Sequence, residues 1–228
     1  MIKNVFFWGA KYKAGIIYDL IINDKITENT KYLSVKYLFD PNLEAPKFSS
    51  NAVFSNKKDQ LNEFFKKSDY FVTCIGSELG KARYLISKEL EKKKLKPLNI
   101  ISKHAYFDNR DFLGKGVQLL PGSIVHYRAT IGDYSILNTG SIVEHDCIIG
   151  NGVHLMPGSV IGGNTKIGDY VTVGLNATVM PQLEVESGAF IGAGAVVTKN
   201  VKKNEVVIGN PAKFLKNIEH RVDLKIFE

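Results

Sequence analysis

A six-residue repeat runs through the second half of this chain. Every sixth residue from Leu113 to Val197 is aliphatic over fifteen consecutive positions, a small residue mostly stands two positions earlier, and glycine often follows directly. A period of six suits short parallel strands joined by tight corners, with three hexads in each coil of about 18 residues. The spacing therefore predicts about five coils of a left-handed parallel β-helix, stacked about 4.8 Å apart.

Prolines mark the corners of this helix. Pro121, Pro157 and Pro181 each stand two residues after an inward aliphatic position. Because proline lacks a backbone donor, it is tolerated at a corner better than within a strand ladder. Corner residues should then form vertical rows with a spacing of 18 residues. One row contains Tyr127, His145, Gly163, Pro181 and Lys199, and another contains Thr139, Pro157, Leu175 and Ala193.

The first part of the chain follows a different pattern. Apolar runs at residues 4–8, 32–39, 70–75 and 98–101 alternate with helix-like stretches that end near residue 24 and cover 78–95. This β-α-β order predicts a Rossmann-like α/β unit with a small parallel sheet. We expect that unit to occupy residues 1–102, followed by the β-helix over 103–210 and a C-terminal tail over 211–228.

Three loops follow predicted strands, at residues 9–15, 40–42 and 76–78. Ligands bind beyond the carboxyl ends of parallel strands, so these loops converge on a candidate site. The first loop opens a helix whose N-terminus attracts phosphate, but it lacks the full G-x-G-x-x-G spacing and also fits a plain strand-to-helix turn. Asp40 fits either a ribose or base contact or an Asp-Pro turn. The candidate binding residues are Gly9, Ala10, Lys11, Asp40, Pro41 and Gly76.

The densest group of polar residues in the repeat spans 138–146, from Asn138 to His145 and Asp146. His145 falls on a corner, and Gly163 lies one coil further in the same row. A histidine can take a proton from an attacking amine, Asp146 can orient the ring, and the Gly163 N–H can stabilise the oxyanion of a thioester carbonyl. The alternative is a solvent-exposed turn histidine.

His154 lies half a coil beyond His145, near the other corner row, so the two histidines cannot meet within one chain. We therefore predict a cyclic homotrimer in which each active site lies between two subunits. The alternative for His154 is a strand residue that faces solvent. The other histidines have no acidic neighbour in sequence and no metal-ligand spacing, so no metal site is expected. They are His104, His126 and His220.

Composition narrows the class of partner. The chain has 30 Lys and Arg against 23 Asp and Glu, a net charge of +7, but the lysines are spread out and the densest run, residues 89–96, mixes signs. This distribution favours small polyanionic ligands over nucleic acid. Two cysteines in separate predicted elements favour a reducing compartment, and no apolar run reaches the roughly 18 residues of a membrane span. We expect a cytoplasmic protein without membrane insertion.

The order of these parts resembles the sialic-acid O-acetyltransferase-like family of bacterial sugar acetyltransferases, which includes the UDP-4-amino-sugar and GDP-perosamine N-acetyltransferases. The resemblance rests on Gly9-Ala10, Asp40, Ile75-Gly76, residues 138–150 and the motif at 209–213. It implies direct transfer of an acetyl group from acetyl-CoA to the amine of a UDP-, dTDP- or GDP-linked amino-deoxy sugar destined for a surface glycan.

The resemblance also implies residue roles. His145 would be the general base with Asp146 as its companion, and Asn138 and the three loops would hold the nucleotide sugar. In the first loop, a Gly-x-Gly-His-type sequence of the family is replaced by Lys11-Tyr-Lys-Ala14, where Lys11 or Lys13 could meet a phosphate. O-acetylation of a sialic-acid-type sugar and a non-catalytic nucleotide-sugar-binding scaffold are the alternatives. The residues that would face acetyl-CoA are His154, Gly163, Leu175, Ala193 and Lys213.

Overall fold

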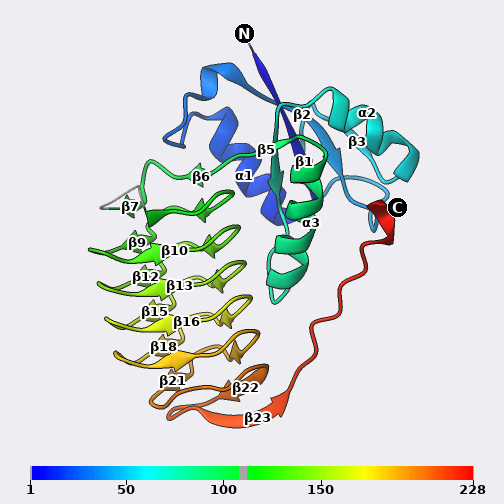
Figure 1. The fold of residues 1–228 in the computed structure, drawn as a ribbon. Coiled ribbons are helices and arrows are strands. Elements are labelled where there is room, and N and C mark those ends of the chain that lie inside the picture. Colours follow the sequence, from blue (N-terminus) through cyan, green and yellow to red (C-terminus); the bar gives the residue numbers. More distant parts are fainter. Residues whose placement is uncertain (1, 108–111, 228) are drawn as a thin grey trace.

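The computed structural model describes residues 2–107 and 112–227, which form an α/β unit above a β-helix (Figure 1). The α/β unit has a five-stranded parallel sheet in the order β3-β2-β1-β4-β5. Its strands are β1 (Lys3–Trp8), β2 (Leu33–Phe39), β3 (Val53–Ser55), β4 (Tyr70–Thr73) and β5 (Lys96–Pro97). Its helices are α1 (Tyr12–Ile22), α2 (Leu61–Lys66) and α3 (Gly80–Lys92), with 3-10 turns η1 (Thr30–Tyr32) and η2 (Lys58–Gln60).

Alternation along β1 explains why helices cover both faces of this sheet. Successive side chains of a strand point to opposite faces. Val5 and Phe7 therefore pack with α1 in one core, whereas Phe6 and Trp8 pack with α2 and α3 in another. The predicted parallel α/β unit is confirmed, with two hydrophobic layers around one sheet.

The last strand of the sheet differs from the prediction at residues 98–101. β5 ends at Pro97, whereas β6 (Ile100–Ile101) pairs with the first coil of the β-helix. The side chain of Asn99 turns the chain between them, because its Oδ1 accepts from the Val117 N–H and its Nδ2 donates to the Gly114 carbonyl. A continuous apolar run could not indicate which sheet it joins. β3 and α2 were also not predicted, because both are short and flanked by charged residues.

The β-helix consists of two-residue strands on three sides of a prism. Each strand pairs in parallel with the strand 18 residues later, as in Ile136 with His154. One side contains β6, β8 (Gln118–Leu119), β11 (Ile136–Leu137), β14 (His154–Leu155), β17 (Thr172–Val173), β20 (Phe190–Ile191) and β22 (Glu205–Ile208). A second contains β7 (Tyr106–Phe107), β9 (Ile124–Val125), β12 (Ile142–Val143), β15 (Val160–Ile161), β18 (Thr178–Val179) and β21 (Val196–Val197). The third contains β10 (Thr130–Ile131), β13 (Ile148–Ile149), β16 (Lys166–Ile167) and β19 (Glu184–Val185).

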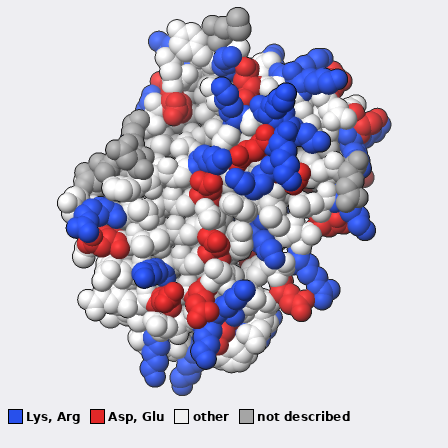
Figure 2. Space-filling view, viewed as in Figure 1, with Lys and Arg blue, Asp and Glu red and all other residues white. Residues whose placement is uncertain are grey.

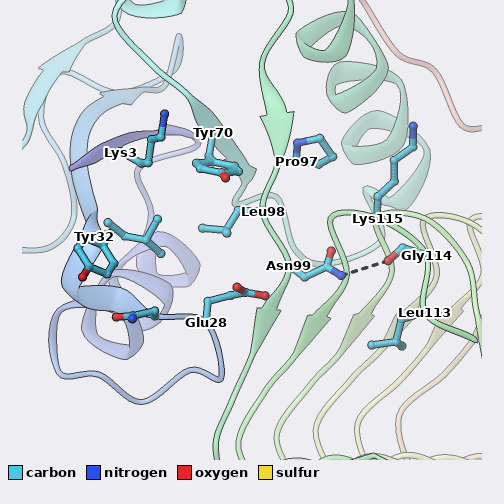
Figure 3. Close-up of a pocket in the computed structure, with 12 residues that line it drawn as sticks. Lys3, Glu28, Tyr32, Tyr70, Pro97, Leu98, Asn99, Leu113, Gly114 and Lys115 are labelled. Carbon is cyan, nitrogen blue, oxygen red and sulfur yellow. Dashed lines mark hydrogen bonds between the residues drawn. The ribbon is translucent and has the colours of Figure 1, made fainter. Parts of the chain in front are cut away.

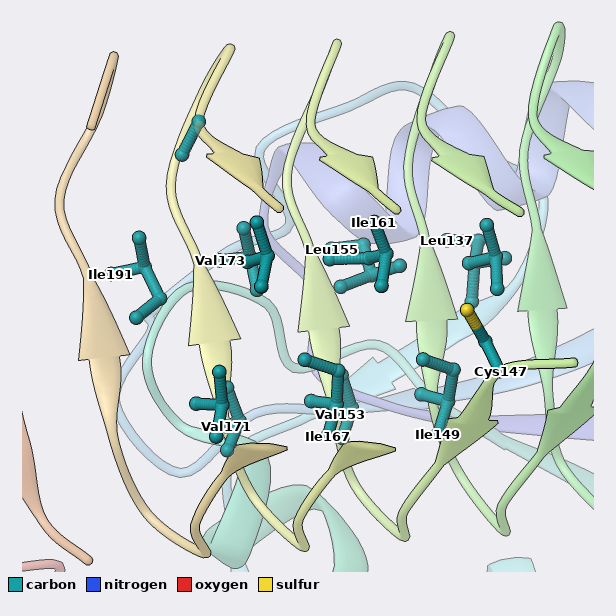
Figure 4. Close-up of a cluster of buried hydrophobic side chains, with 14 of the residues drawn as sticks. Leu137, Cys147, Ile149, Val153, Leu155, Ile161, Ile167, Val171, Val173 and Ile191 are labelled. Atoms are coloured by element: carbon teal, nitrogen blue, oxygen red, sulfur yellow. The ribbon is translucent and has the colours of Figure 1, made fainter. Parts of the chain in front are cut away.

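The predicted inward positions form the core of the prism. Figure 4 shows Leu137, Leu155, Val173 and Ile191 in successive coils, and all four are fully buried. Leu113 bridges to Ile131, so the first predicted hexad also belongs to the stack. Burial of each such side chain contributes about 1.5–3 kcal/mol. The six-residue period therefore sets both the register and the core.

Two of the three sides have contrasting surroundings. The side of β6 to β22 lies against the α/β unit, and its outward residues Ile136, His154 and Thr172 are buried; we call it the covered face. The side of β10 to β19 is the polar face. Its outward residues are Thr130, Ile148, Lys166 and Glu184, of which the last three are exposed.

The third side, from β7 to β21, is the apolar face. Its outward side chains are only partly buried, although they are mostly aliphatic. The corner that follows β12 leads to the polar face and carries His145, and the corner that precedes β15 leads back to the covered face and carries Pro157. The apolar face is therefore bounded by the two corner rows predicted from the sequence. Its outward residues are Ile124, Ile142, Val160, Thr178 and Val196.

After β22, the chain turns back along the molecule. β23 (Lys213–Asn217) pairs antiparallel with β22, and residues 218–227 then run to the α/β unit and end in η4 (Lys225–Phe227) (Figure 1). Phe227 stacks on Trp8 with ring centroids 4.7 Å apart, and Leu224 and Ile226 pack on the same core. The segment predicted only as a tail therefore completes the N-terminal core.

Charged side chains of both signs are interspersed on the face shown in Figure 2. At the end of α3, Lys88 pairs with Glu91 at 3.3 Å and Lys92 pairs with Glu89 at 2.6 Å. The mixed-sign run is thus a solvated helix end with local ion pairs. None of the helices in the described part of the chain is long and apolar enough to cross a bilayer.

Candidate active site

The three predicted loops meet in a cavity of about 820 Å³ between the α/β unit and the covered face. The cavity lies beyond the carboxyl ends of β1, β2 and β4, as expected for a parallel sheet. We call it the loop cavity. Tyr12, Lys13, Met156 and Pro157 line it, as do Asp223 and Ile226 from the C-terminal segment. The predicted site residues that line it are Gly9, Lys11, Asp40, Pro41, Gly76, Asn138, His154 and Leu175.

Asp40 holds the shape of this site. One carboxylate oxygen accepts from the Ala10 N–H at 3.1 Å, and the other accepts from the Asn42 N–H at 3.1 Å. Asp40 is buried, and these bonds favour the turn interpretation of the Asp-Pro pair. The prediction that Ala10 contacts substrate is wrong, because its side chain is fully buried in the core with α1. Ala10 instead fixes the first loop through its backbone.

His154 projects from β14 toward the third loop and is only 3% exposed. Its Nδ1 lies 2.9 Å from the Ser77 carbonyl, which can only accept, so Nδ1 carries the proton. Its Nε2 then accepts from the Asn138 amide at 3.4 Å. Burial lowers its pKa to about 3, and the nearby cations of Arg83 and Lys13 add to the effect. The solvent-facing alternative is excluded, and His154 is a neutral wall of the cavity.

Lys13 lies in the first turn of α1, and its Nζ is buried without a hydrogen-bond partner among the described residues. Burial lowers the pKa of this amine to about 8, with repulsion from Arg83 as the second cause. A Cβ at Gly76 would lie 3.5 Å from Lys13 Cε and 3.9 Å from His154 Cε1. The glycine therefore leaves open space in front of both side chains.

Arg83 positions the cavity from behind. Its fully buried guanidinium donates to the carbonyls of Ile75 and Tyr134 at 2.9 and 2.7 Å, and to those of Gly152 and Val153 at 2.8 and 3.1 Å. These bonds connect α3 and the third loop to two coils. Sequence reasoning missed Arg83, because an arginine in an amphipathic helix ordinarily reads as a surface residue.

His145 and Asp146 form a second group on the corner between the apolar and polar faces. His145 Nδ1 donates to Asp146 Oδ2 at 2.9 Å, and Arg128 Nε lies 3.0 Å from Asp146 Oδ1. Arg128 stands one coil before Asp146, so its spacing of 18 residues was the signal that could have revealed it. The carboxylate thus holds the ring with Nε2 free to accept a proton.

Gly163 lies against this imidazole, as the corner row predicted. A Cβ at Gly163 would stand 2.6 Å from His145 Nε2, and Asn164 N donates to the His145 carbonyl at 2.9 Å. Asp146 itself has a φ of 58°, the left-handed conformation of the second corner residue. The corner therefore brings together an oriented base and a glycine backbone without an intervening side chain.

The remaining predicted site residues lie away from the loop cavity. Ala193 stands one coil beyond Leu175, and Lys213 lies exposed at the start of β23. His126, expected to lack an acidic neighbour, has its Nε2 3.9 Å from Glu144 Oε1 because the two residues are 18 apart. Within residues 2–107 and 112–227, no group of three or more His, Cys, Asp or Glu side chains could hold a metal ion.

A second cavity of about 530 Å³ lies at the opposite edge of the α/β sheet (Figure 3). It includes Lys3, Glu28 and Tyr70 near the start of the strands, and Lys115 from the first coil. It contains none of the predicted site residues and no histidine. Because ligands of parallel sheets bind at the opposite strand ends, we assign the site to the loop cavity and the His145 corner.

The fold and this site define a protein of hexapeptide repeats, a left-handed parallel β-helix joined to a Rossmann-like α/β unit. The sequence profile of the family described as bacterial transferase hexapeptide (six repeats) matches residues 146–179. A search of curated protein sequences found no significant match.

Solved structures share the whole architecture. A histidine-to-asparagine mutant of perosamine N-acetyltransferase from Caulobacter crescentus, in complex with CoA and GDP-perosamine, has a TM-score of 0.81 at 23% identity over 95% of this chain and 99% of that chain. The acetyltransferase domain of PglB from Neisseria gonorrhoeae has a TM-score of 0.80 at 23% identity over 93% and 100%. WeeI from Acinetobacter baumannii has a TM-score of 0.75 at 26% identity over 92% and 99%. The predicted order of an α/β unit and a hexapeptide β-helix is confirmed.

Proposed function

We propose that this chain is an acetyltransferase that moves an acetyl group from acetyl-CoA to the amine of a nucleotide-linked amino-deoxy sugar. The observation that carries the proposal is the corner where His145, held by Asp146, faces the backbone of Gly163. Two structural neighbours support it, since one was solved with CoA and GDP-perosamine and the PglB domain with acetyl-CoA. The cytoplasm, where both substrates are made, is the location that this proposal requires.

The corner residues fit direct transfer. The sugar amine attacks the thioester carbonyl, and His145 Nε2 takes the proton that the nitrogen loses. The Gly163 N–H, which has no hydrogen bond to a described residue, is placed to donate to the oxyanion. Collapse of this intermediate breaks the C–S bond, and the departing CoA thiolate takes the proton back from His145. Asp146 stabilises the transient imidazolium and is itself held by Arg128.

We further propose that the active protein is a cyclic trimer. The apolar face exposes a column of aliphatic side chains that a second copy could cover. If this face turns toward the three-fold axis, the His145 edge of one subunit lies beside the Pro157 and Leu175 edge of the next. Pro157 and Leu175 line the loop cavity. The base of one subunit would then serve the nucleotide sugar held by its neighbour.

The first test is the variant His145→Asn. Loss of the base should lower kcat by about 10²–10⁴-fold, measured as thiol release from acetyl-CoA with a panel of UDP-, dTDP- and GDP-linked amino sugars. Gly163→Ala should also lower kcat, because the new methyl group displaces the exposed imidazole into solvent, and neither variant should change Tm. His126→Asn, at another exposed histidine of the prism, is the matched control and should keep wild-type turnover.

Two results would contradict the proposal. Turnover of His145→Asn within a few-fold of wild type would remove His145 as the base. Thiol release only with hydroxyl sugars would replace N-acetylation by O-acetylation, and binding of nucleotide sugars without any thiol release would indicate a scaffold.

A further inference from the structure

We propose that Lys13 is the anion-binding residue of the loop cavity and takes a phosphate oxygen of the nucleotide diphosphate. The inference rests on the proposed function and deepens it, because it names the group that selects a nucleotide-linked sugar over a free one. It also distinguishes Lys13 from Lys11, which the sequence left as equal candidates.

The Lys13 amine has no internal partner. Its Nζ is buried, and none of the ion pairs between described residues includes it. The two carboxylates that line the cavity are otherwise engaged: both oxygens of Asp40 accept backbone N–H groups, and Asp223 accepts from the Lys225 N–H. An unpaired buried ammonium is unfavourable in the empty protein, so a bound anion would supply what the fold withholds.

The other positive groups nearby are not free to bind an anion. Arg83 is fully buried and donates to four carbonyls, and His154 is neutral. Lys11 also lines the cavity, but it is exposed to solvent. Lys13 is therefore the cation that meets the open space left by Gly76.

The backbone around Lys13 adds to this preference. Lys13 belongs to the first turn of α1, an 11-residue helix that has no side-chain cap at Lys11. Helix N-termini carry unpaired N–H groups and a partial positive charge. The lowered pKa of Lys13, about 8, is also consistent with a site that awaits an anion. A bound phosphate would raise that pKa, so binding near pH 8.5 should take up protons.

Two ligands of the proposed reaction carry a diphosphate, the nucleotide sugar and CoA. The first-strand loop lies at the α/β unit, so we assign the Lys13 contact to the nucleotide sugar. The test is isothermal titration of wild type and Lys13→Met with UDP, GDP, dTDP, CoA and inorganic pyrophosphate at pH 7.0. Uridine, guanosine and thymidine, which lack phosphate, are the matched ligands.

The nucleoside diphosphate that wild type binds best should bind Lys13→Met at least about tenfold more weakly, the effect of losing a charge-assisted bond. Binding of the matched nucleoside and of CoA should stay within about twofold. Lys11→Met, on the same loop, is the control and should change diphosphate binding less than Lys13→Met. Proton uptake on binding at pH 8.5, measured in buffers of different ionisation enthalpy, should disappear in Lys13→Met. Its Tm without ligand should rise, because an unpaired buried charge is removed.

Unchanged nucleoside diphosphate affinity in Lys13→Met would overturn the inference. Weaker binding of CoA alone would also overturn it, because the anion would then belong to the acetyl donor. If wild type acetylates an amino sugar and Lys13→Met binds diphosphates normally, only this inference fails. If diphosphate binding depends on Lys13 but no substrate releases thiol, the acetyltransferase proposal fails and the anion site remains.

Discussion

The two histidines singled out by the sequence have opposite surroundings in the folded chain. The His145 side chain is 58% exposed and hydrogen-bonded to a carboxylate, whereas His154 is 3% exposed and hydrogen-bonded to a carbonyl. An exposed ring can exchange protons with a substrate, and a buried ring beside Lys13 and Arg83 cannot become charged without cost. Proton transfer therefore belongs to His145, and His154 shapes the cavity.

The burial of His154 makes stability depend on pH. Its pKa is about 3 in the folded chain against about 6.5 when unfolded, so the unfolded state binds the proton first as pH falls. This contribution is fully present above pH 6.5 and is lost progressively between pH 6.5 and pH 3. At pH 5 the loss should be about 2 kcal/mol.

Urea unfolding at pH 7 and pH 5 should detect this loss in wild type. His154→Gln lacks the titrating group and should lose about 2 kcal/mol less between the two pH values. Equal losses in the two proteins would show that His154 titrates normally when folded.

At the level of residues, the sequence predicted what the 18-residue spacing controls. It placed Gly163 beside His145 and put His154 on another side of the prism. It could not predict that Lys13 is buried or that Arg83 binds carbonyls of the β-helix, because those facts depend on how the α/β unit packs on the covered face. Only side-chain environments that arise within the repeat are encoded by its period.

Among the elements, α3 is the one that couples the two units. Gly80, at its first residue, lies so close to Gly152 of the β-helix that a Cβ would overlap the Gly152 carbonyl. Arg83 follows one turn later, and Tyr134 from the next coil up bonds to Glu91 near the end of α3. The helix therefore touches the β-helix at both of its ends.

We expect Arg83→Met to lower the free energy of unfolding by about 3 kcal/mol, because buried carbonyls lose their donors. Activity should fall as well, since the Ile75 carbonyl in the third loop is one of the acceptors. Urea unfolding monitored by Trp8 fluorescence measures the change. Lys92→Met, which removes only an exposed ion pair of the same helix, should alter stability by less than about 0.5 kcal/mol. A normal urea midpoint for Arg83→Met would rule out this coupling.

Periodicity predicted the elements of the β-helix better than those of the α/β unit. Fifteen hexads reinforce one another, so one irregular hexad cannot shift the register. The short strand Val53–Ser55 and the six-residue α2 have no repeat to support them. Residues 218–227 were not predicted to have a role, because their contacts with Trp8 and Lys81 are with residues far away in the sequence.

For the whole molecule, the apolar face leads to a prediction about assembly. Val160→Asp places a charge at the middle of this face, so we expect sedimentation to show a trimer for wild type and a monomer for the variant. Thiol release should fall with the trimer. Lys166→Asp on the polar face is the control and should remain trimeric. An active wild-type monomer would contradict a site shared between subunits.

Mixed trimers sharpen this test. His145→Asn lacks the base, and Gly76→Leu fills the loop cavity, so each variant alone should be inactive. In trimers reassembled from equal amounts, about a quarter of the sites should combine an intact cavity with an intact neighbouring base. Activity should therefore return on mixing only if the two groups come from different subunits.

The return of residues 218–227 to the α/β unit links the beginning of synthesis to its later stages. Domains made early usually fold before the rest of the chain has emerged. Here the ring that stacks on Trp8 belongs to Phe227, which the ribosome adds only after the whole β-helix. The unit that emerges first thus waits for the residues of η4 to complete its core, and until then the aromatic surface around Trp8 must be kept from other partners.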